Sequence, residues 1–336
     1  MKFLGALFAF VALTASTVFA APSINQEDKT FYYWINTDSK TATVTGVKDK
    51  NAQKVTIKPY ITVEGNRYYV KQIGAGAFSN TYIQHIVVPS RVQSMNFSPN
   101  AFNGARDIRN IELNIENVTA DQYAFDGIDK NVGFTGIGVP NLINNYAKVI
   151  LQSWNLPVGK DYTNVSPDTF NKALYKLAYK VKKNFYLDDK VAYNNSVASV
   201  LALKAGGREG IARAYRILAR NMGFQYHDVH VGGDGGRYSW NYVYIVKDSD
   251  YKRWFNLDIV DTEFRSSRYD ASVFKTMDEM KNSIQSNVNP RDWIIYENQY
   301  NYPNEFILVN GEKWYYDPPY GDFYSWLVRN RSGVQA

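Results

Sequence analysis

Few side chains in this sequence could attack a substrate or take up a proton at neutral pH. The 336 residues include no cysteine and three histidines, His85, His227 and His230. The absence of cysteine excludes a thiol nucleophile, a disulfide scaffold and a zinc-thiolate or iron–sulfur site. His227 and His230 fall on opposite faces of a β-rich segment, and two imidazoles without a third ligand rarely hold a metal. We therefore predict no metal site and no cofactor.

Carboxylates are the remaining candidates for acid–base chemistry. Asp258, Asp261 and Glu263 lie close together in the sequence, and a pair of carboxylates can supply the acid and the base of a hydrolysis. Acidic side chains usually lie on the solvated surface. We favour this second interpretation for all three.

Two helices and several strands would position these residues. Apolar residues at helical spacing predict a helix from residue 168 to about residue 187, with Ser166 as its N-cap. A second helix is expected from residue 209 to about residue 221, ended by Gly223. β-rich segments follow at 225–231, 238–246 and 253–259. Helices followed by an antiparallel sheet predict an α+β domain.

Three strings in this region resemble the core of the transglutaminase-like superfamily, which has a papain-like fold. The usual strings of that family are Gly-x-Cys-Glu-Gly at a helix start, His-Ala-Trp-Asn on a strand and Trp-x-x-Val-Asp on the next strand. Here they correspond, in order, to Gly206-Gly-Arg-Glu-Gly, Tyr238-Ser-Trp-Asn and Trp254-Phe-Asn-Leu-Asp. The resemblance covers about residues 190–265. It implies that Arg208 stands where the family has its nucleophilic cysteine, Tyr238 where it has histidine, and Asp258 where it has the orienting aspartate.

Neither replacement preserves the chemistry of the family. The guanidinium of Arg208 stays protonated at neutral pH and has no lone pair to attack a carbonyl. The phenol of Tyr238, with an ordinary pKa of about 10, is a poor general base. We therefore predict a catalytically inactive domain, a pseudoenzyme, in which Arg208, Tyr238 and Asp258 form a hydrogen-bonded set. The alternative is an active hydrolase or acyl-transferase of the same superfamily that works without a thiol.

Aromatic residues are the candidates for ligand binding in this half. Trp240, Tyr242 and Trp254, or their neighbours, would line the groove that holds a substrate chain in the parent fold, and could stack on a peptide or a sugar. Packing in the core is the alternative for each ring, because alternate residues of a strand face opposite sides. A second aromatic cluster spans residues 293–326. Burial is favoured over carbohydrate contact for that cluster.

The first half of the chain is built from repeats. Ala77-Phe78, Ala101-Phe102 and Ala124-Phe125 recur at spacings of 24 and 23 residues, and β-rich runs follow the first two pairs at 83–89 and 108–113. A unit this short cannot bury its apolar face alone. We therefore expect stacked units in which each phenylalanine points into a shared core.

This half resembles leucine-rich repeats of the bacterial surface-antigen (BspA-like) type. The Ile-Gly-x-x-Ala-Phe string at 73–78 and the Ile-Val-Val-Pro-Ser string at 86–90 are similar to its repeat unit, and residues 137–146 are similar to its closing helix. The resemblance covers roughly residues 30–155. It implies a short leucine-rich-repeat β-solenoid of about three repeats, of a kind implicated in adhesion and protein binding.

The N-terminus predicts export. Lys2 precedes an apolar run over residues 3–13, and an A-x-A-like cleavage site ends at Ala20. This pattern is typical of a secretory signal peptide, and no stretch reaches the ~18–20 apolar residues of a membrane span. We expect a signal peptide at 1–20, the repeat domain at 24–158 and the transglutaminase-like domain at 160–336, in a secreted or cell-surface protein.

Composition and charge are consistent with an extracellular partner. With 45% apolar and 21% charged residues the chain can form ordinary cores, and its formal charge of +6 is small for its length. Export and this charge argue against nucleic acid. The expected partner is an extracellular protein, peptide or polysaccharide, and the oligomeric state stays undefined. Five sequons could carry glycans if the source glycosylates exported proteins: Asn96, Asn117, Asn164, Asn194 and Asn330.

Overall fold

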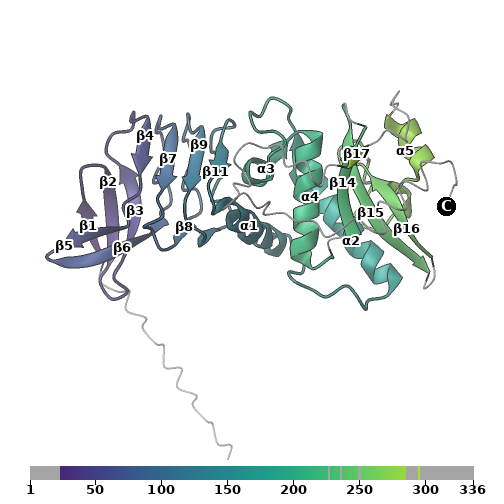
Figure 1. Cartoon of the computed structure of the whole chain (residues 1–336), viewed down its shortest axis with the longest axis horizontal. Helices are drawn as coiled ribbons and strands as arrows, with labels where there is room; N and C mark the ends of the chain where they lie inside the picture. Colours follow the sequence, from purple (N-terminus) through teal and green to yellow (C-terminus); the bar gives the residue numbers. More distant parts are fainter. Residues whose placement is uncertain (1–22, 226–227, 235–236, 249–250, 285–293, 296–336) are drawn as a thin grey trace, which may run out of the picture.

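The computed structural model describes residues 23–225, 228–234, 237–248, 251–284 and 294–295. Within these residues, a strand-built half and a half of helices and strands lie end to end (Figure 1). The predicted signal peptide, His227, the aromatic rings expected at 293–326 and the sequon at Asn330 lie outside the described residues. No helix in the described part of the chain is long and apolar enough to cross a membrane.

The N-terminal half is a β-solenoid. An antiparallel sheet of β1 (Ser23–Glu27), β2 (Phe31–Asn36) and β3 (Thr41–Val47) begins it, and β5 (Tyr60–Val63) forms a hairpin with β6 (Asn66–Ile73). The coils then stack in parallel. One ladder joins β3, β6, β8 (Met95–Phe97) and β10 (Val118–Ala120), and the other joins β4 (Lys54–Thr56), β7 (His85–Val88), β9 (Asn110–Leu113) and β11 (Gly133–Thr135).

The recurring phenylalanines form a column inside the solenoid. The rings of Phe78 and Phe102 stack with centroids 5.5 Å apart, and those of Phe102 and Phe125 stack at 5.6 Å with an interplanar angle of 5°. All three rings are buried. The expected shared core of stacked units is therefore confirmed. Each ring fills the space between two coils, which one repeat could not enclose by itself.

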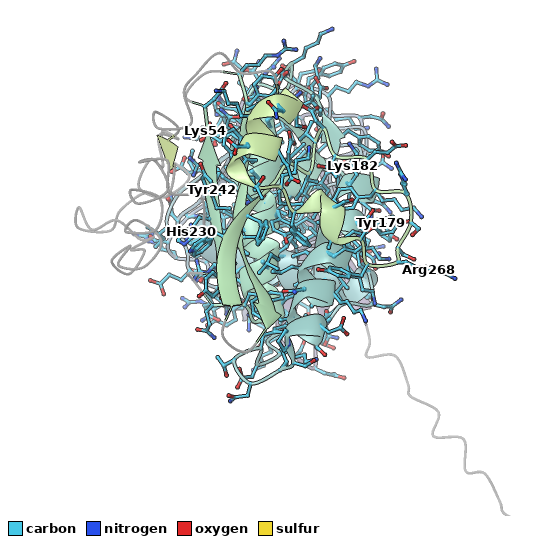
Figure 2. All side chains as sticks on the ribbon, turned by 90° about the vertical axis from the view of Figure 1, so that its right-hand side faces the viewer. Lys54, Tyr179, Lys182, His230, Tyr242 and Arg268 are labelled. Atoms are coloured by element: carbon cyan, nitrogen blue, oxygen red, sulfur yellow. The ribbon has the colours of Figure 1, made fainter. Side chains whose placement is uncertain are left out.

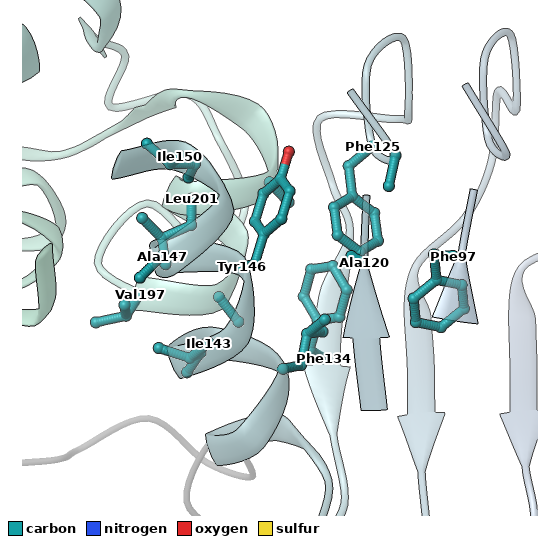
Figure 3. Close-up of a cluster of buried hydrophobic side chains, with 14 of the residues drawn as sticks. Phe97, Ala120, Phe125, Phe134, Ile143, Tyr146, Ala147, Ile150, Val197 and Leu201 are labelled. Carbon is teal, nitrogen blue, oxygen red and sulfur yellow. The ribbon is translucent and has the colours of Figure 1, made fainter. Parts of the chain in front are cut away.

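Helix α1 (Val139–Ser153) closes the last coil. It begins at Val139-Pro140, where proline suits the first helical turn. On one side Tyr146 packs edge-on against Phe125 at 5.3 Å, and on the other Val197 and Leu201 of α3 (Val197–Leu203) cover it (Figure 3). Because both sides of α1 are buried, the apolar core runs without a break from the solenoid into the C-terminal half.

The C-terminal half places helices against an antiparallel sheet. Its longer helices are α2 (Pro167–Asn184) and α4 (Arg208–Met222), which pack on the sheet. The sheet has the order β16 (Tyr251–Leu257), β15 (Ser239–Asp248), β14 (Val229–Gly233) and β17 (Ile294–Ile295). The smaller elements are β12 (Tyr186–Leu187), β13 (Ala205–Gly206), the 3-10 helix η2 (Ala271–Val273) and α5 (Met277–Ile284). Together these elements give the predicted mixed α and β region.

Helix α2 begins where the sequence predicts and ends earlier. The hydroxyl of Ser166 accepts a hydrogen bond from the Thr169 N–H, as expected of an N-cap. The helix stops at Asn184, short of the expected residue 187, because the chain then extends as β12. The Tyr186 N–H donates to the Lys204 carbonyl, and β12 pairs in parallel with β13. Tertiary pairing therefore overrides the helical pattern of the last turn.

The Pro/Gly stretch between the halves is fixed to the end of α4. The N–H groups of Gly159 and Lys160 donate to the carbonyls of Asn221 and Met222. Gly223 has φ +117°, and a Cβ there would lie 1.8 Å from the Lys160 oxygen. Glycine is therefore required at this crossing. The boundaries 24–158 and 160–336 remain a prediction, since the two halves share one core.

Asp28 holds the first hairpin together, and its ionisation should be visible in the pH dependence of stability. Its carboxylate accepts hydrogen bonds from the Thr30 and Phe31 N–H groups and the Tyr33 hydroxyl, and pairs with Lys58 at 2.8 Å. Burial alone would raise the pKa of Asp28, but Lys58 and these hydrogen bonds lower it from 3.8 to about 2. The stabilisation is thus present above pH 3.8 and is lost as the pH falls through about 2.

We expect Asp28→Asn to lower the free energy of unfolding by about 1–2 kcal/mol at pH 7, since one pKa unit corresponds to about 1.4 kcal/mol. The gap between wild type and variant should narrow as the pH approaches 2. Urea unfolding at a series of pH values between 7 and 2.5 measures it. A gap that stays constant over that range would mean that the carboxylate charge has no role.

Candidate functional site

The candidate site lies at the start of α4, where glycines allow two backbone segments to touch. The Gly207 N–H donates to the Asn194 carbonyl at 2.7 Å. A Cβ at Gly206 would lie 2.6 Å from that carbonyl oxygen, and one at Gly210 only 2.2 Å from it. The glycines of the Gly-Gly-Arg-Glu-Gly string therefore let the chain at Asn194 pack against the first turn of α4. Arg208 is the first residue of that helix.

Three elements bring Arg208, Tyr238 and Asp258 together. The Arg208 guanidinium carbon lies 5.1 Å from the centre of the Tyr238 ring, next to the start of β15. Asp258 follows the end of β16, and its charge acts on Arg208. Their assignment as the catalytic positions of the family remains a prediction.

The bonding within this group differs from the predicted set. Arg208 Nη1 donates to Asp261 Oδ2 at 2.6 Å, and Tyr238 offers the guanidinium its ring face. Asp258 instead uses Oδ1 to accept the N–H groups of Val260 and Asp261, at 3.0 and 3.1 Å. Asp258 thus shapes the turn that presents Asp261 to Arg208. The expectation of a solvated surface position holds for Asp261 and Glu263, which are exposed, and is wrong for Asp258, which is buried. Nothing in the spacing of Asp261 indicates its pairing with Arg208.

Charge and burial set the ionisation of this group, in which Asp258 is buried and Asp261 is exposed. Asp258 is 1% exposed, and burial raises its pKa, which the charge of Asp261 raises further and Arg208 partly offsets. Burial would lower the pKa of Arg208, but the hydrogen bond and charge of Asp261 raise it. Arg208 therefore stays a cation. A guanidinium in this state can neither attack a carbonyl nor accept a proton.

The predicted groove rings are core residues. Trp240, Tyr242 and Trp254 are buried, and they pack with Met280 and Ile284 of α5. Figure 2 looks toward this end of the molecule, where Tyr242 pairs across strands with His230. Because all three rings are buried, the structure favours the packing alternative.

Asn241, the last residue of the Tyr238-Ser-Trp-Asn string, joins three elements, and its sequence pattern alone indicates no role. Its Nδ2 donates to the Ala212 carbonyl of α4 at 2.8 Å and to the His230 carbonyl of β14 at 3.1 Å. The side chain is fully buried. The Trp-Asn pair of the strand string thus has a structural role: Trp240 packs under α5 while Asn241 fastens β15 to α4.

The described sequons differ in access. Asn117 and Asn164 are exposed. Asn96 is half-buried, with Nδ2 donating to Asp121 and Oδ1 accepting from Thr119. Asn194 is also half-buried and donates to the Asp189 carbonyl. Glycosylation remains a prediction, with Asn117 and Asn164 the most accessible positions. No group of three or more His, Asp or Glu residues able to hold a metal occurs among the described residues.

Comparison with known families gives a match within the C-terminal half. The family model of the transglutaminase-like superfamily matches residues 158–259, which include α2, α4 and strands β14 to β16. The chain therefore carries a transglutaminase-like domain at residues 158–259, without a cysteine, after a β-solenoid. A comparison with curated proteins finds no match.

Several solved structures of bacterial repeat proteins are similar to part of this chain. A leucine-rich repeat protein from Bacteroides capillosus is 23% identical over 33% of this chain and 86% of that chain, with a TM-score of 0.27. A leucine-rich cell surface protein from Faecalibacterium prausnitzii is 21% identical over 34% of this chain and 30% of its own, with a TM-score of 0.30. The pneumococcal vaccine antigen PcpA is 15% identical over 34% of this chain and 39% of its own, with a TM-score of 0.23. The present chain thus spans well under half of the latter two.

Proposed function

We propose that this protein is a secreted pseudoenzyme that binds an extracellular protein, peptide or polysaccharide. The observation that carries the proposal is Arg208, a cation bonded to Asp261 and stacked on Tyr238. The sequence resemblance predicts a cysteine at this position in an active member of the family. Since the chain has no cysteine, the thiol chemistry of the family is not available to it.

Arg208 serves a structural purpose in this proposal. A cation at the positive end of a helix costs about 0.3–1 kcal/mol on its own. The carboxylate of Asp261 offsets that cost, and the contact with Tyr238 contributes about 0.5–1 kcal/mol. The group thereby ties the start of α4 to the turn after β16 and to the chain before β15.

The solenoid supports a binding role. Tyr32 and Trp34 alternate with buried residues on β2 and are exposed. Trp34 lies in a row of successive cross-strand partners whose other members carry hydroxyl or amide groups: Asn25, Thr43, Gln72, Asn96 and Thr119. Exposed rings beside groups that both donate and accept hydrogen bonds suit a polysaccharide or a protein surface.

We expect the protein to show no turnover in either reaction typical of the family. The test measures transfer of a labelled primary amine to a glutaminyl peptide, and hydrolysis of peptide substrates, with wild type and Arg208→Ala. Both proteins should give the rate of buffer alone. Thermal unfolding shows whether the variant is folded. Turnover by wild type that disappears in Arg208→Ala would instead support the alternative, an active hydrolase or acyl-transferase without a thiol.

A further inference from the structure

An open cavity of about 330 Å³ lies where the solenoid meets the C-terminal half. Side chains from four parts of the chain line it: Tyr123 from the last solenoid turn, Tyr146 and Trp154 at α1, Lys180 and Lys183 from α2, and Lys204 after α3. It is separate from the Arg208 group, none of whose residues lines it. The cavity belongs to the junction, so neither half forms it alone.

Tyr123 occupies a backbone position that does not suit an aromatic residue. The residues directly before the three Ala-Phe pairs are Gly76, Asn100 and Tyr123, with φ of 68°, 57° and 64°. Glycine and asparagine tolerate this left-handed conformation, whereas a bulky side chain is strained there. The tyrosine ring is 47% exposed, so it adds little to the solenoid core. Its presence indicates a role outside the repeat stack.

Lys204, on the opposite side of the junction, also has a left-handed backbone conformation. It ends α3 with φ 55°, where glycine or asparagine is usual. Its ammonium group bonds to Asp126 at 2.9 Å and lies 5.3 Å from the centre of the Tyr123 ring. Two strained residues from different halves thus meet at the wall of one cavity.

The cavity has an excess of positive charge. Three lysines line it and no acidic residue does. Lys204 is paired with Asp126, whereas Lys180 and Lys183 have no carboxylate within ion-pair distance in the described part of the chain. Two ammonium groups are therefore available to an anion, which they would attract most strongly at low ionic strength.

The remaining lining residues narrow the class of anion. Gln122, Ser153 and Asn184 add amide and hydroxyl groups, beside the rings of Tyr123 and Trp154. Ser153 Oγ and Asn184 Nδ2 already donate to the carbonyls of Ile150 and Lys180, so these two side chains offer their oxygens as acceptors. A sugar suits this lining, because amide and hydroxyl groups bond to the sugar hydroxyls and aromatic faces pack on the sugar ring. The volume is at the lower end of the range for small-ligand pockets, about 300–1,000 Å³, which suits one sugar unit better than a peptide segment.

We propose that this cavity binds a carboxylate-bearing sugar of an extracellular glycan. Lys180 and Lys183 face its carboxylate, and Tyr123 and Trp154 contact its ring. The proposal rests on the binding function proposed above, to which it adds a site and a ligand class.

Titration of the full chain with N-acetylneuraminic acid and with glucuronic acid tests this, with N-acetylglucosamine and glucose as neutral counterparts. We expect binding of an acidic sugar that weakens with added salt and exceeds binding of its neutral counterpart at least tenfold. Lys180→Ala/Lys183→Ala should lose at least tenfold in affinity. The matched control Lys172→Ala/Lys176→Ala removes the same charge from the exposed face of α2 and should stay within twofold.

Tyr123→Asn separates binding from folding, because it introduces the residue that the preceding repeat uses at this turn. We expect it to weaken sugar binding at least tenfold while the Tm stays the same or rises. A lowered Tm with unchanged affinity would make Tyr123 a structural residue and overturn the proposal.

Other results would also contradict the proposed site, and one of them would contradict the proposed binding function as well. Equal binding of acidic and neutral sugars, or tighter binding of an acidic peptide, would contradict the ligand class. If the full chain binds glycans on an array and the cavity variants bind them equally well, the cavity is wrong and the binding function stands. If the full chain binds no extracellular glycan, peptide or protein, both are wrong.

Discussion

Replacing Phe102 with alanine is expected to lower the free energy of unfolding by about 3–5 kcal/mol, the usual loss for a large buried aromatic side chain. Phe102 is fully buried between Phe78 and Phe125, and its ring also lies 5.5 Å from that of Phe97. Parallel strands fix the spacing of the coils on both sides. The neighbouring rings therefore cannot close the space that the missing ring leaves.

Two further variants provide losses in the free energy of unfolding with which this one can be compared. Phe102→Leu keeps much of the apolar volume and should cost less than Phe102→Ala. Tyr82→Ala removes a ring that is 51% exposed and should change stability by no more than about 0.5 kcal/mol. Urea unfolding measures all three. Equal losses for Phe102→Ala and Tyr82→Ala would contradict the central place of the phenylalanine column.

The same experiment reports on the junction. Because α1 is buried on both sides, the two halves should unfold together, and Phe102→Ala should shift a single transition. Two transitions, of which only one moves, would mean that the halves fold independently.

The sequence predicts the solenoid well because its signals are local and recur. Each Ala-Phe pair marks one coil, and the strings that follow form the strands β7 and β9. The Val139-Pro140 start of α1 is also a local signal. Any single pair would be ambiguous, but three in phase define the stack.

The candidate site is predicted less fully, because its contacts depend on turns and on covering elements. The string at the start of α4 and the two strand strings single out Arg208, Tyr238 and Asp258 as site candidates. Nothing local in the sequence shows that Asp261 is the partner of Arg208. Strand alternation separates Trp240 from Asn241 without showing which face α5 covers. The strained turn at Tyr123 becomes visible only when it is aligned with Gly76 and Asn100.

The central claim, that residues 208 and 238 stand at the positions of a lost nucleophile and base, can be tested by restoring both. Since the chain has no cysteine, Arg208→Cys introduces its only thiol, and alkylation reports on that group alone. In this single variant the carboxylates of Asp258 and Asp261 lose the guanidinium that offsets them. Like charge disfavours a thiolate, so its pKa should be at or above the ordinary ~8.5.

Adding Tyr238→His should reverse that shift. An imidazolium near the thiolate and the N-terminus of α4 both stabilise negative charge. We expect the pKa of the thiol in Arg208→Cys/Tyr238→His to be at least about one unit below that of the single variant. This raises the thiolate fraction near pH 6.5 about tenfold, and the alkylation rate by less, because a thiolate of lower pKa is a weaker nucleophile. Arg208→Cys/Tyr238→Phe is the matched control, because it removes the phenol oxygen without supplying an imidazole.

The decisive measurement is the rate of iodoacetamide alkylation against pH for these three variants. A midpoint for the cysteine–histidine variant well below those of the other two would place the two residues at the nucleophile and base positions of the transglutaminase-like domain. The same midpoint in all three would contradict that placement, and with it the view that this domain is a former enzyme whose site Arg208 now closes.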